Sequence, residues 1–148
     1  MNATINHDLV DFSDFFQTMK QNNYKYSEIT EKIIGCAMAV HRELGNGFPE
    51  IIYQRALAIE LELAEINFKC EFEMPIYYRG HLIGKRRADF LVENLIPLEI
   101  KATTKLEDIH LAQAMNYLEA YNLEVGLLLN FGERSLQFKR VHNKKYTH

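Results

Sequence analysis

Residues 86–102 read RRADFLVENLIPLEIKA, and this stretch is the most informative in the chain. Apolar residues dominate on both sides of the central pair Glu93-Asn94, and such a polar break between two apolar runs is typical of a turn between strands. The pattern therefore predicts two antiparallel strands, about 86–92 and 96–102, joined by a tight connection.

The acidic residues of this hairpin meet only if the two strands pair in one particular register. Glu99 and Lys101 lie two residues apart and therefore project from the same face of their strand. A two-residue loop would place Asp89 opposite Leu98, on the wrong face, whereas a three-residue loop (93–95) or a bulge places it opposite Glu99. Asp89 directly precedes the apolar run 90–92, where a lone carboxylate would be costly to bury without a partner, and we therefore predict the second register. Two carboxylates would then converge beside one lysine, and a hard divalent cation is the natural way to relieve their repulsion.

The remaining sequence predicts helices and strands around this hairpin. The predicted elements are, in order, a helix over 27–44, a helix from Pro49 to about 65, a strand over 68–74 that Pro75 interrupts, a hairpin turning at Arg79-Gly80, the two strands above, a helix from a capping box at 104–107 to about 121, a strand over 125–129 and an edge strand over 136–141. The strand over 125–129 is almost wholly apolar and follows a helix, so it should be covered on both faces and pair in parallel with an earlier strand. The predicted fold class is α/β, with a mixed central sheet flanked by helices.

Length and composition fit one globular domain. The 148 residues are 47% hydrophobic and 25% charged, and we assign 27–148 to that domain. Residues 1–26 are predicted to be a leader, flexible or docked as a short helix. Its three phenylalanines make a homodimer or a protein partner plausible. The 17 Lys+Arg against 20 Asp+Glu give a net charge of −3, which argues against a protein that wraps nucleic acid by bulk charge.

Two widely spaced cysteines, Cys36 and Cys70, form no metal or disulfide pattern, which favours a reducing compartment. No apolar run is long enough for a membrane span, and the acidic N-terminus does not resemble a signal peptide. We therefore predict a cytoplasmic protein that makes no membrane contact.

Four motifs follow one another along the chain: GxxExxY at 47–53, an aspartate on a strand (Asp89), ExK at 99–101 and QxxxY at 113–117. In this order the chain resembles the GxxExxY family, a small branch of the PD-(D/E)XK nuclease superfamily related to RecB-like nuclease domains. The resemblance covers about 27–141 and implies a restriction-endonuclease-like core. One departure is Ala88, which stands where the proline of the superfamily name would be.

The resemblance implies a metal-dependent nuclease that uses Mg²⁺ or Mn²⁺. The catalytic residues that it implies are Asp89 and Glu99 as the main metal ligands, Glu50 reaching the same or a second metal from its helix, Lys101 orienting the attacking water, and Gln113 projecting towards the site. Further candidates for substrate contact are Arg86, Arg87, His110 and Tyr117. Three of these helix residues, at 110, 113 and 117, share one helix face, whereas adjacent Arg86 and Arg87 alternate, so at most one points into the site.

Each of these residues also has a simpler explanation. Glu99 and Lys101 could form a surface ion pair, and Glu50 in the first turn of a helix is favoured by the helix dipole alone. The predicted function is hydrolysis of phosphodiester bonds, with DNA as the expected substrate; no residue pattern in the sequence distinguishes DNA from RNA. The alternatives are a non-catalytic module that keeps the nuclease fold to bind nucleic acid or a partner, and a structural ion cluster in an unrelated α/β protein.

Overall fold

The computed structural model describes residues 26–148, and within them it has three helices and five strands. The elements are α2 (Ser27–Leu44), α3 (Glu50–Leu63), β1 (Phe68–Tyr78), β2 (His81–Val92), β3 (Ile96–Lys101), α4 (Asp108–Ala120), β4 (Val125–Asn130) and β5 (Gln137–His142). The predicted leader falls almost wholly on residues 1–25, which lie outside the described residues, and the division of the chain at residue 26 stays a prediction. No helix within 26–148 is long and apolar enough to cross a membrane.

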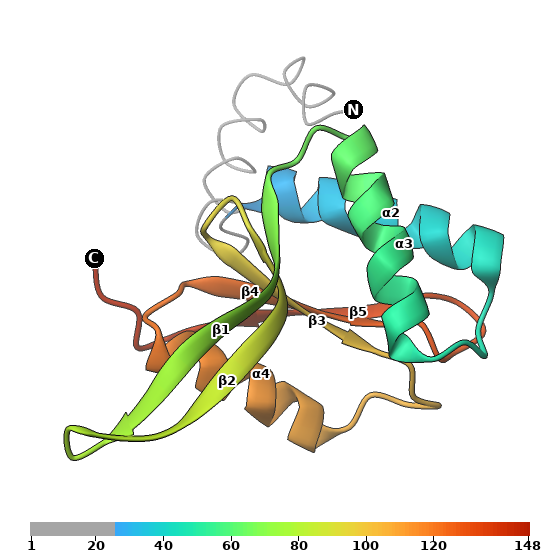
Figure 1. Ribbon diagram of the computed structural model, residues 1–148. Coiled ribbons are helices and arrows are strands. Elements are labelled where there is room, and N and C mark those ends of the chain that lie inside the picture. The colour runs from blue at the N-terminus through green and yellow to red at the C-terminus, as the bar shows by residue number, and fades with distance from the viewer. Residues whose placement is uncertain (1–25) are drawn as a thin grey trace, which may run out of the picture.

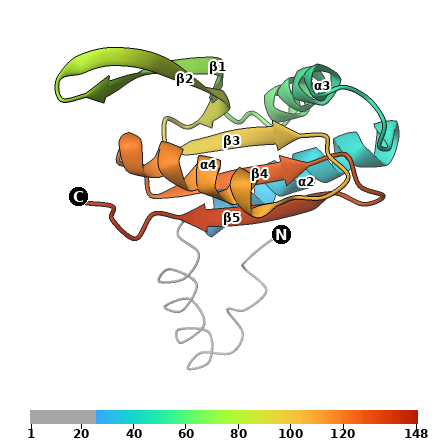
Figure 2. The ribbon, with the colours of Figure 1, turned by 90° about the horizontal axis from the view of Figure 1, so that it is seen from below.

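The five strands form one mixed sheet in the order β1-β2-β3-β4-β5, in which β3 and β4 run parallel and every other pair is antiparallel. Helices α2 and α3 cover one face of the sheet, and α4 crosses the other (Figures 1 and 2). The predicted α/β class, with a mixed sheet flanked by helices, is confirmed.

The core lies between the sheet and the α2–α3 layer. On α2, Ile33 and Ala37 are completely buried, and α3 contributes Leu57 and Leu61 to the same core. All six residues of β4 are buried, because α4 packs on one side of this strand and α2 and α3 close the other. The predictions that β4 is covered on both faces and pairs in parallel are therefore confirmed.

The hairpin of β1 and β2 is longer than predicted. Pro75 does not interrupt β1 but pairs with Lys85 inside it, and β2 runs without a break from 81 to 92. Proline is tolerated there because β1 is an edge strand, whose outward-facing backbone needs no ladder partner. The turn itself is as predicted: Arg79 (φ 49°) and Gly80 (φ 79°) both adopt the positive φ of a two-residue hairpin loop.

The start of α4 is also different from the prediction. The capping box is formed by Glu107 and His110, so the helix begins at Asp108 rather than just after Thr104. The preceding segment is held in a non-helical form by the side chain of Asn130, whose Oδ1 accepts the Thr103 N–H (3.0 Å) and whose Nδ2 donates to the Thr103 carbonyl (3.0 Å). These bonds fix the chain just beyond β3.

A substitution at Gly132 tests the close approach of the chain after β4 to the chain after β3. A Cβ there would collide with the carbonyl oxygen of Thr103 and lie 2.5 Å from the carbonyl carbon of Ala102. Because both are backbone atoms, we expect Gly132→Ala to destabilise the protein by about 2 kcal/mol or more. Gly35→Ala is the control, since its Cβ would meet nothing within 4 Å and alanine should stabilise the helix by up to about 1 kcal/mol. Urea unfolding measures both, and a Gly132→Ala protein as stable as the parent would contradict the described packing.

Candidate functional site

The register between β2 and β3 decides which side chains share a face. Phe90 pairs with Leu98, and Val92 pairs with Ile96, so the connection consists of three residues, 93–95. One step further in the same register, Asp89 lies level with Glu99. The predicted three-residue register is confirmed, and the two carboxylates lie on the face opposite the α2–α3 core.

Asp89 and Glu99 contact each other and the end of β3. Asp89 Oδ2 accepts the backbone N–H of Ile100 at 2.7 Å, and the Asp89 and Glu99 side chains are hydrogen bonded to each other. Two carboxyl groups can share a hydrogen bond only if one of them carries a proton. Because the pKa of Glu99 is raised to about 7, Glu99 is the member of the pair that carries the proton below that pH.

The electrostatics of the pair agree with this shared proton. Burial, and after it the negative charge of Asp89, raise the pKa of Glu99 to about 7, and the positive charges of Arg86 and Lys101 offset part of the increase. Burial also raises the pKa of Asp89, although the Ile100 N–H and the positive charges of Lys101 and Arg87 counteract it. Desolvation and like charge thus disfavour two bare carboxylates, and an additional positive charge would relieve both.

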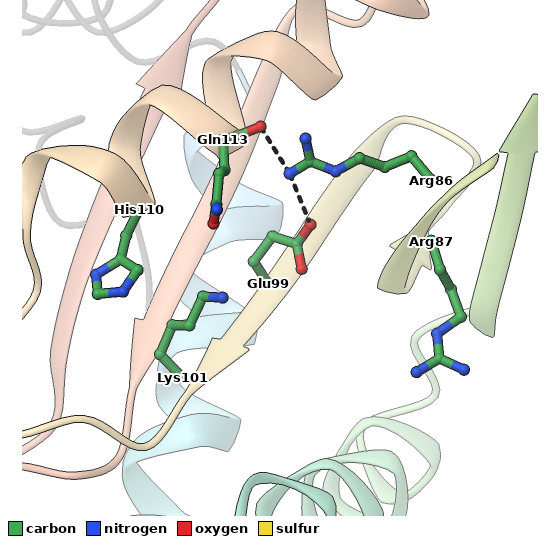
Figure 3. Close-up of a pocket in the computed structure, with 6 residues that line it drawn as sticks. All are labelled: Arg86, Arg87, Glu99, Lys101, His110 and Gln113. Atoms are coloured by element: carbon green, nitrogen blue, oxygen red, sulfur yellow. Dashed lines mark hydrogen bonds and ion pairs between the residues drawn. The ribbon is translucent and has the colours of Figure 1, made fainter. Parts of the chain in front are cut away.

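A pocket of about 380 Å³ opens beside Glu99. Its lining comes from β2, β3 and α4 and consists of Arg86, Arg87, Glu99, Lys101, His110 and Gln113 (Figure 3). Three of the six side chains are cations and one is an anion. This surplus of positive charge suits an anionic ligand, such as a phosphate, at the carboxylate pair.

The two arginines have different surroundings. Arg86 points at the site: its Nη2 lies 3.7 Å from Glu99 Oε1 and donates to the Gln113 carbonyl at 2.8 Å. Arg87 points away from Glu99 (Figure 3), and its Nη1 lies 3.8 Å from Glu71 Oε2. Both line the pocket, but only Arg86 engages the Glu99 carboxylate.

The α4 residues divide into two groups. Gln113 directs its amide into the pocket (Figure 3), and His110 lines the pocket while its Nδ1 accepts the Glu107 N–H at 3.0 Å. Tyr117 is only 1% exposed and lies under the Arg86 guanidinium, 5.7 Å from ring centre to Cζ. The ring supports Arg86 from below and has almost no free surface, and a contact between Tyr117 and substrate stays a prediction.

Glu50 is not brought into the carboxylate pair. It is the first residue of α3, is exposed, and does not line the pocket. Within residues 26–148 no group of three or more His, Cys, Asp or Glu side chains is arranged to hold a metal ion. The structure thus unites two of the three predicted metal ligands.

The other residues of the GxxExxY motif shape the loop before α3. The Tyr53 hydroxyl donates to the Gly45 carbonyl at 2.6 Å and accepts the Phe48 N–H at 3.2 Å. Its ring stacks on Phe131 with centroids 4.7 Å apart. Tyr53 therefore fastens the α2–α3 loop to the core, which is a structural role.

Asn130 is the residue at this site that the sequence analysis missed. It is completely buried at the end of β4, pairs with Lys101 across the parallel ladder, and fixes the chain just past Lys101 through Thr103. Its Nδ2 also donates to Glu133 Oε2 at 2.8 Å. The available signal was a single amide at the end of an otherwise apolar strand, because a buried amide needs nearby partners.

Comparison with known proteins agrees with this fold. The family model described as the PD-(D/E)XK nuclease superfamily matches residues 27–141. Among solved structures, the crystal structure of SSO0001 is similar with a TM-score of 0.51 and 23% sequence identity; the alignment covers 85% of this chain and 61% of that one. No curated protein matches the sequence.

The chain therefore belongs to the PD-(D/E)XK nuclease superfamily. The predicted superfamily is confirmed, whereas the assignment to its GxxExxY branch stays a prediction. The likeness to SSO0001 concerns the fold alone, and this chain spans about three fifths of that protein's length.

The pKa of Glu99 gives a prediction about stability. In the unfolded chain a glutamate titrates near pH 4.3, so the folded protein loses stability as the pH rises from there through about 7. Glu99→Gln keeps a neutral side chain throughout. With EDTA present, we expect its melting temperature to match the parent near pH 5 and exceed it by roughly 3 to 8 °C at pH 8.

The matched control is Glu73→Gln, whose side chain is more than half exposed and is paired with Lys85; its difference from the parent should not change with pH. Differential scanning calorimetry from pH 5 to 8.5 measures both. A Glu99→Gln difference that stays flat, or that shrinks as the pH rises, would refute the shared proton.

Proposed function

We propose that this protein is a divalent-metal-dependent nuclease that hydrolyses phosphodiester bonds of DNA. The observation that carries the proposal is the meeting of Asp89 and Glu99 at the edge of a pocket with surplus positive charge, which Glu99 and Lys101 line. Membership of the nuclease superfamily supports the same reaction class.

The residues present fit a hard divalent cation. Mg²⁺ and Mn²⁺ prefer oxygen ligands, and the two carboxylates have raised pKa values because nothing in the protein compensates their charge fully. Asp89 and Glu99 would hold the ion, which when bound polarises the phosphate and lowers the pKa of a coordinated water. A contribution of Glu50 to the same or a second ion stays a prediction.

The surrounding side chains would bind and orient the substrate. Lys101 carries a compact positive charge next to Glu99, where it can donate a hydrogen bond to the attacking water and offset charge that grows on the phosphate. Arg86, Arg87 and His110 supply further donors on the pocket wall for phosphate oxygens. Gln113 offers an amide that can orient the water or a phosphate oxygen.

A second candidate is a module that binds nucleic acid without cutting it. The observations that favour it are the ion pair between Arg86 and Glu99, which occupies one carboxylate, and the position of Glu50 outside the pair. This module would need the positive charges of the same pocket but no bound ion. DNA as the ligand, a homodimer or protein partner, and a cytoplasmic location also stay predictions.

A nuclease assay separates the two candidates. We expect the purified protein to cut DNA with Mg²⁺ or Mn²⁺ and not with EDTA. Lys101→Ala should lower the rate about 100-fold or more, because one preorganised donor to developing charge is worth that much, and Asp89→Asn should abolish cutting. Lys105→Ala, an exposed residue outside the pocket, is the control and should cut at the parent rate. Retained binding without cutting by the parent, in every metal, would establish the module instead.

Metal binding can be measured without activity. An ion that binds only the folded protein stabilises it by about 2.7 kcal/mol at a hundredfold excess over Kd, which should raise the melting temperature by roughly 5 to 10 °C. We expect this rise with Mn²⁺ for the parent and for Asp108→Asn, an exposed control on α4, but not for Asp89→Asn. Glu50→Gln shows directly whether Glu50 is a ligand: if it is, the rise is reduced. An equal rise in Asp89→Asn would mean that the ion binds elsewhere.

A further inference from the structure

The β1–β2 hairpin extends well past the point where β2 leaves β3. Pairing between β2 and β3 stops at Phe90, but β1 and β2 stay paired as far as Tyr78 and His81. We call residues 74–86 the arm. Figures 1 and 2 show it projecting from the body of the protein on the side where α4 lies.

The end of the arm carries exposed apolar side chains. Tyr77, Tyr78, Leu82 and Ile83 are each about 60% exposed. The Arg79 guanidinium lies 5.6 Å from the centre of the Tyr78 ring. Large apolar side chains grouped at the end of a projecting hairpin are typical of an interaction surface.

The charge of this segment selects the kind of partner. The arm contains three Lys or Arg residues (Arg79, Lys85 and Arg86) and no Asp or Glu. At its base, Lys85 and Arg86 lie 3.8 Å and 3.7 Å from the carboxylates of Glu73 and Glu99, whereas Arg79 at the end of the arm lies against the Tyr78 ring. A second copy of the arm would offer no acidic side chain to Arg79. Aromatic rings interleaved with arginine and lysine instead match a nucleic acid strand, which offers base faces for stacking and phosphates for ion pairs.

The base of the arm is fixed to the pocket wall. The Tyr121 hydroxyl of α4 lies 3.1 Å from the Met74 carbonyl oxygen and 3.0 Å from that of Pro75. Arg86, which closes the arm on the other strand, donates to the Gln113 carbonyl and lines the pocket. The end of the arm is therefore held at a set distance from the carboxylate pair.

That distance corresponds to a short length of nucleic acid. From Arg86 to His81 is five residues of extended strand, or roughly 17 Å. At about 3.4 Å per stacked nucleotide, the arm spans about five nucleotides. A strand that enters the pocket would thus meet Tyr77 and Tyr78 a few nucleotides away from the phosphate at Glu99.

We propose that the arm binds the unpaired nucleic acid strand that flanks the phosphate in the pocket, with Tyr77 and Tyr78 stacking on bases and Arg79 contacting a phosphate. The strand must be unpaired because the broad faces of paired bases are covered by their neighbours in a duplex. This inference rests on the proposed function, since it assumes that the pocket receives a phosphodiester.

The test measures affinity as a function of strand length. Fluorescence anisotropy with EDTA present, so that no strand is cut, compares oligonucleotides of about 4 and about 12 nucleotides, within the range of known single-strand site sizes. The parent should bind the longer strand more tightly. The double substitution Tyr77→Ala with Tyr78→Ala should lower the affinity for the longer strand about tenfold to a hundredfold. This variant should therefore bind the longer strand little better than the shorter one. The double substitution Tyr77→Phe with Tyr78→Phe keeps both aromatic rings, so it should bind the longer strand more tightly than the shorter one, as the parent does.

Two further measurements isolate the arm. Ile59→Ala with Leu63→Ala removes two exposed apolar residues of α3 and is the control, with no expected loss. Arg79→Ala should make the dependence of log affinity on log salt shallower by about 0.7, the value for one phosphate contact on a single strand. DNA and RNA of the same sequence are both used: binding to either supports the inference, and the tighter one identifies the source of the strand.

Several results would overturn the inference. The first two are that the double alanine variant binds the long strand as tightly as the parent, or that it loses the same factor of affinity for the short and the long strand. The third is that the parent binds blunt duplex more tightly than single strand. The fourth is that the alanine substitutions change the oligomeric state and leave the affinity for nucleic acid unchanged. The proposed function is tested separately: length-dependent binding that needs the tyrosines but occurs without any cutting would keep this inference and reject the nuclease. Metal-dependent cutting with no dependence on the tyrosines would do the reverse.

Discussion

The candidate site depends on the number of residues between β2 and β3. Three residues, 93–95, connect the strands, and the turn is closed by the Leu95 N–H on the Val92 carbonyl at 2.9 Å. Glu93 and Asn94 both adopt positive φ there, which an asparagine accepts more readily than a glutamate. Because side chains alternate along a strand, one residue more or less would turn Asp89 into the α2–α3 core, away from Glu99. The pair of carboxylates is thus a consequence of loop length.

Bringing two carboxylates together on a half-buried face has an energetic cost that the protein only partly offsets. The Ile100 N–H, Lys101 and Arg86 each favour a charged carboxylate in the pair, yet burial and mutual repulsion still raise both pKa values. Elsewhere the same fold is well satisfied, with a continuous apolar core and a buried Asn130 whose amide is fully bonded. A local conflict of charge in an otherwise consistent structure is characteristic of a functional site.

The sequence predicted those features that depend on neighbours along the chain. The apolar run of β4 implied burial on both faces, and the cost of burying Asp89 alone implied the odd register with Glu99. Prediction from the sequence failed for features that depend on contacts between segments far apart in the chain. The length of the arm depends on pairing across Pro75, and the start of α4 depends on Asn130, which lies on a later strand. The distance of Glu50 from the pair is set by how α3 packs on the sheet, and no spacing within a motif encodes that packing.

The central claim is that Asp89 and Glu99 together form the binding site of a hard divalent cation. The most direct measurement is a crystal structure of the protein grown with Mn²⁺, with anomalous diffraction used to locate the ion. The account predicts a strong anomalous peak in contact with carboxylate oxygens of both residues, next to Lys101. A peak at any other group of residues, or side chains of 89 and 99 on opposite faces of the sheet, would contradict it.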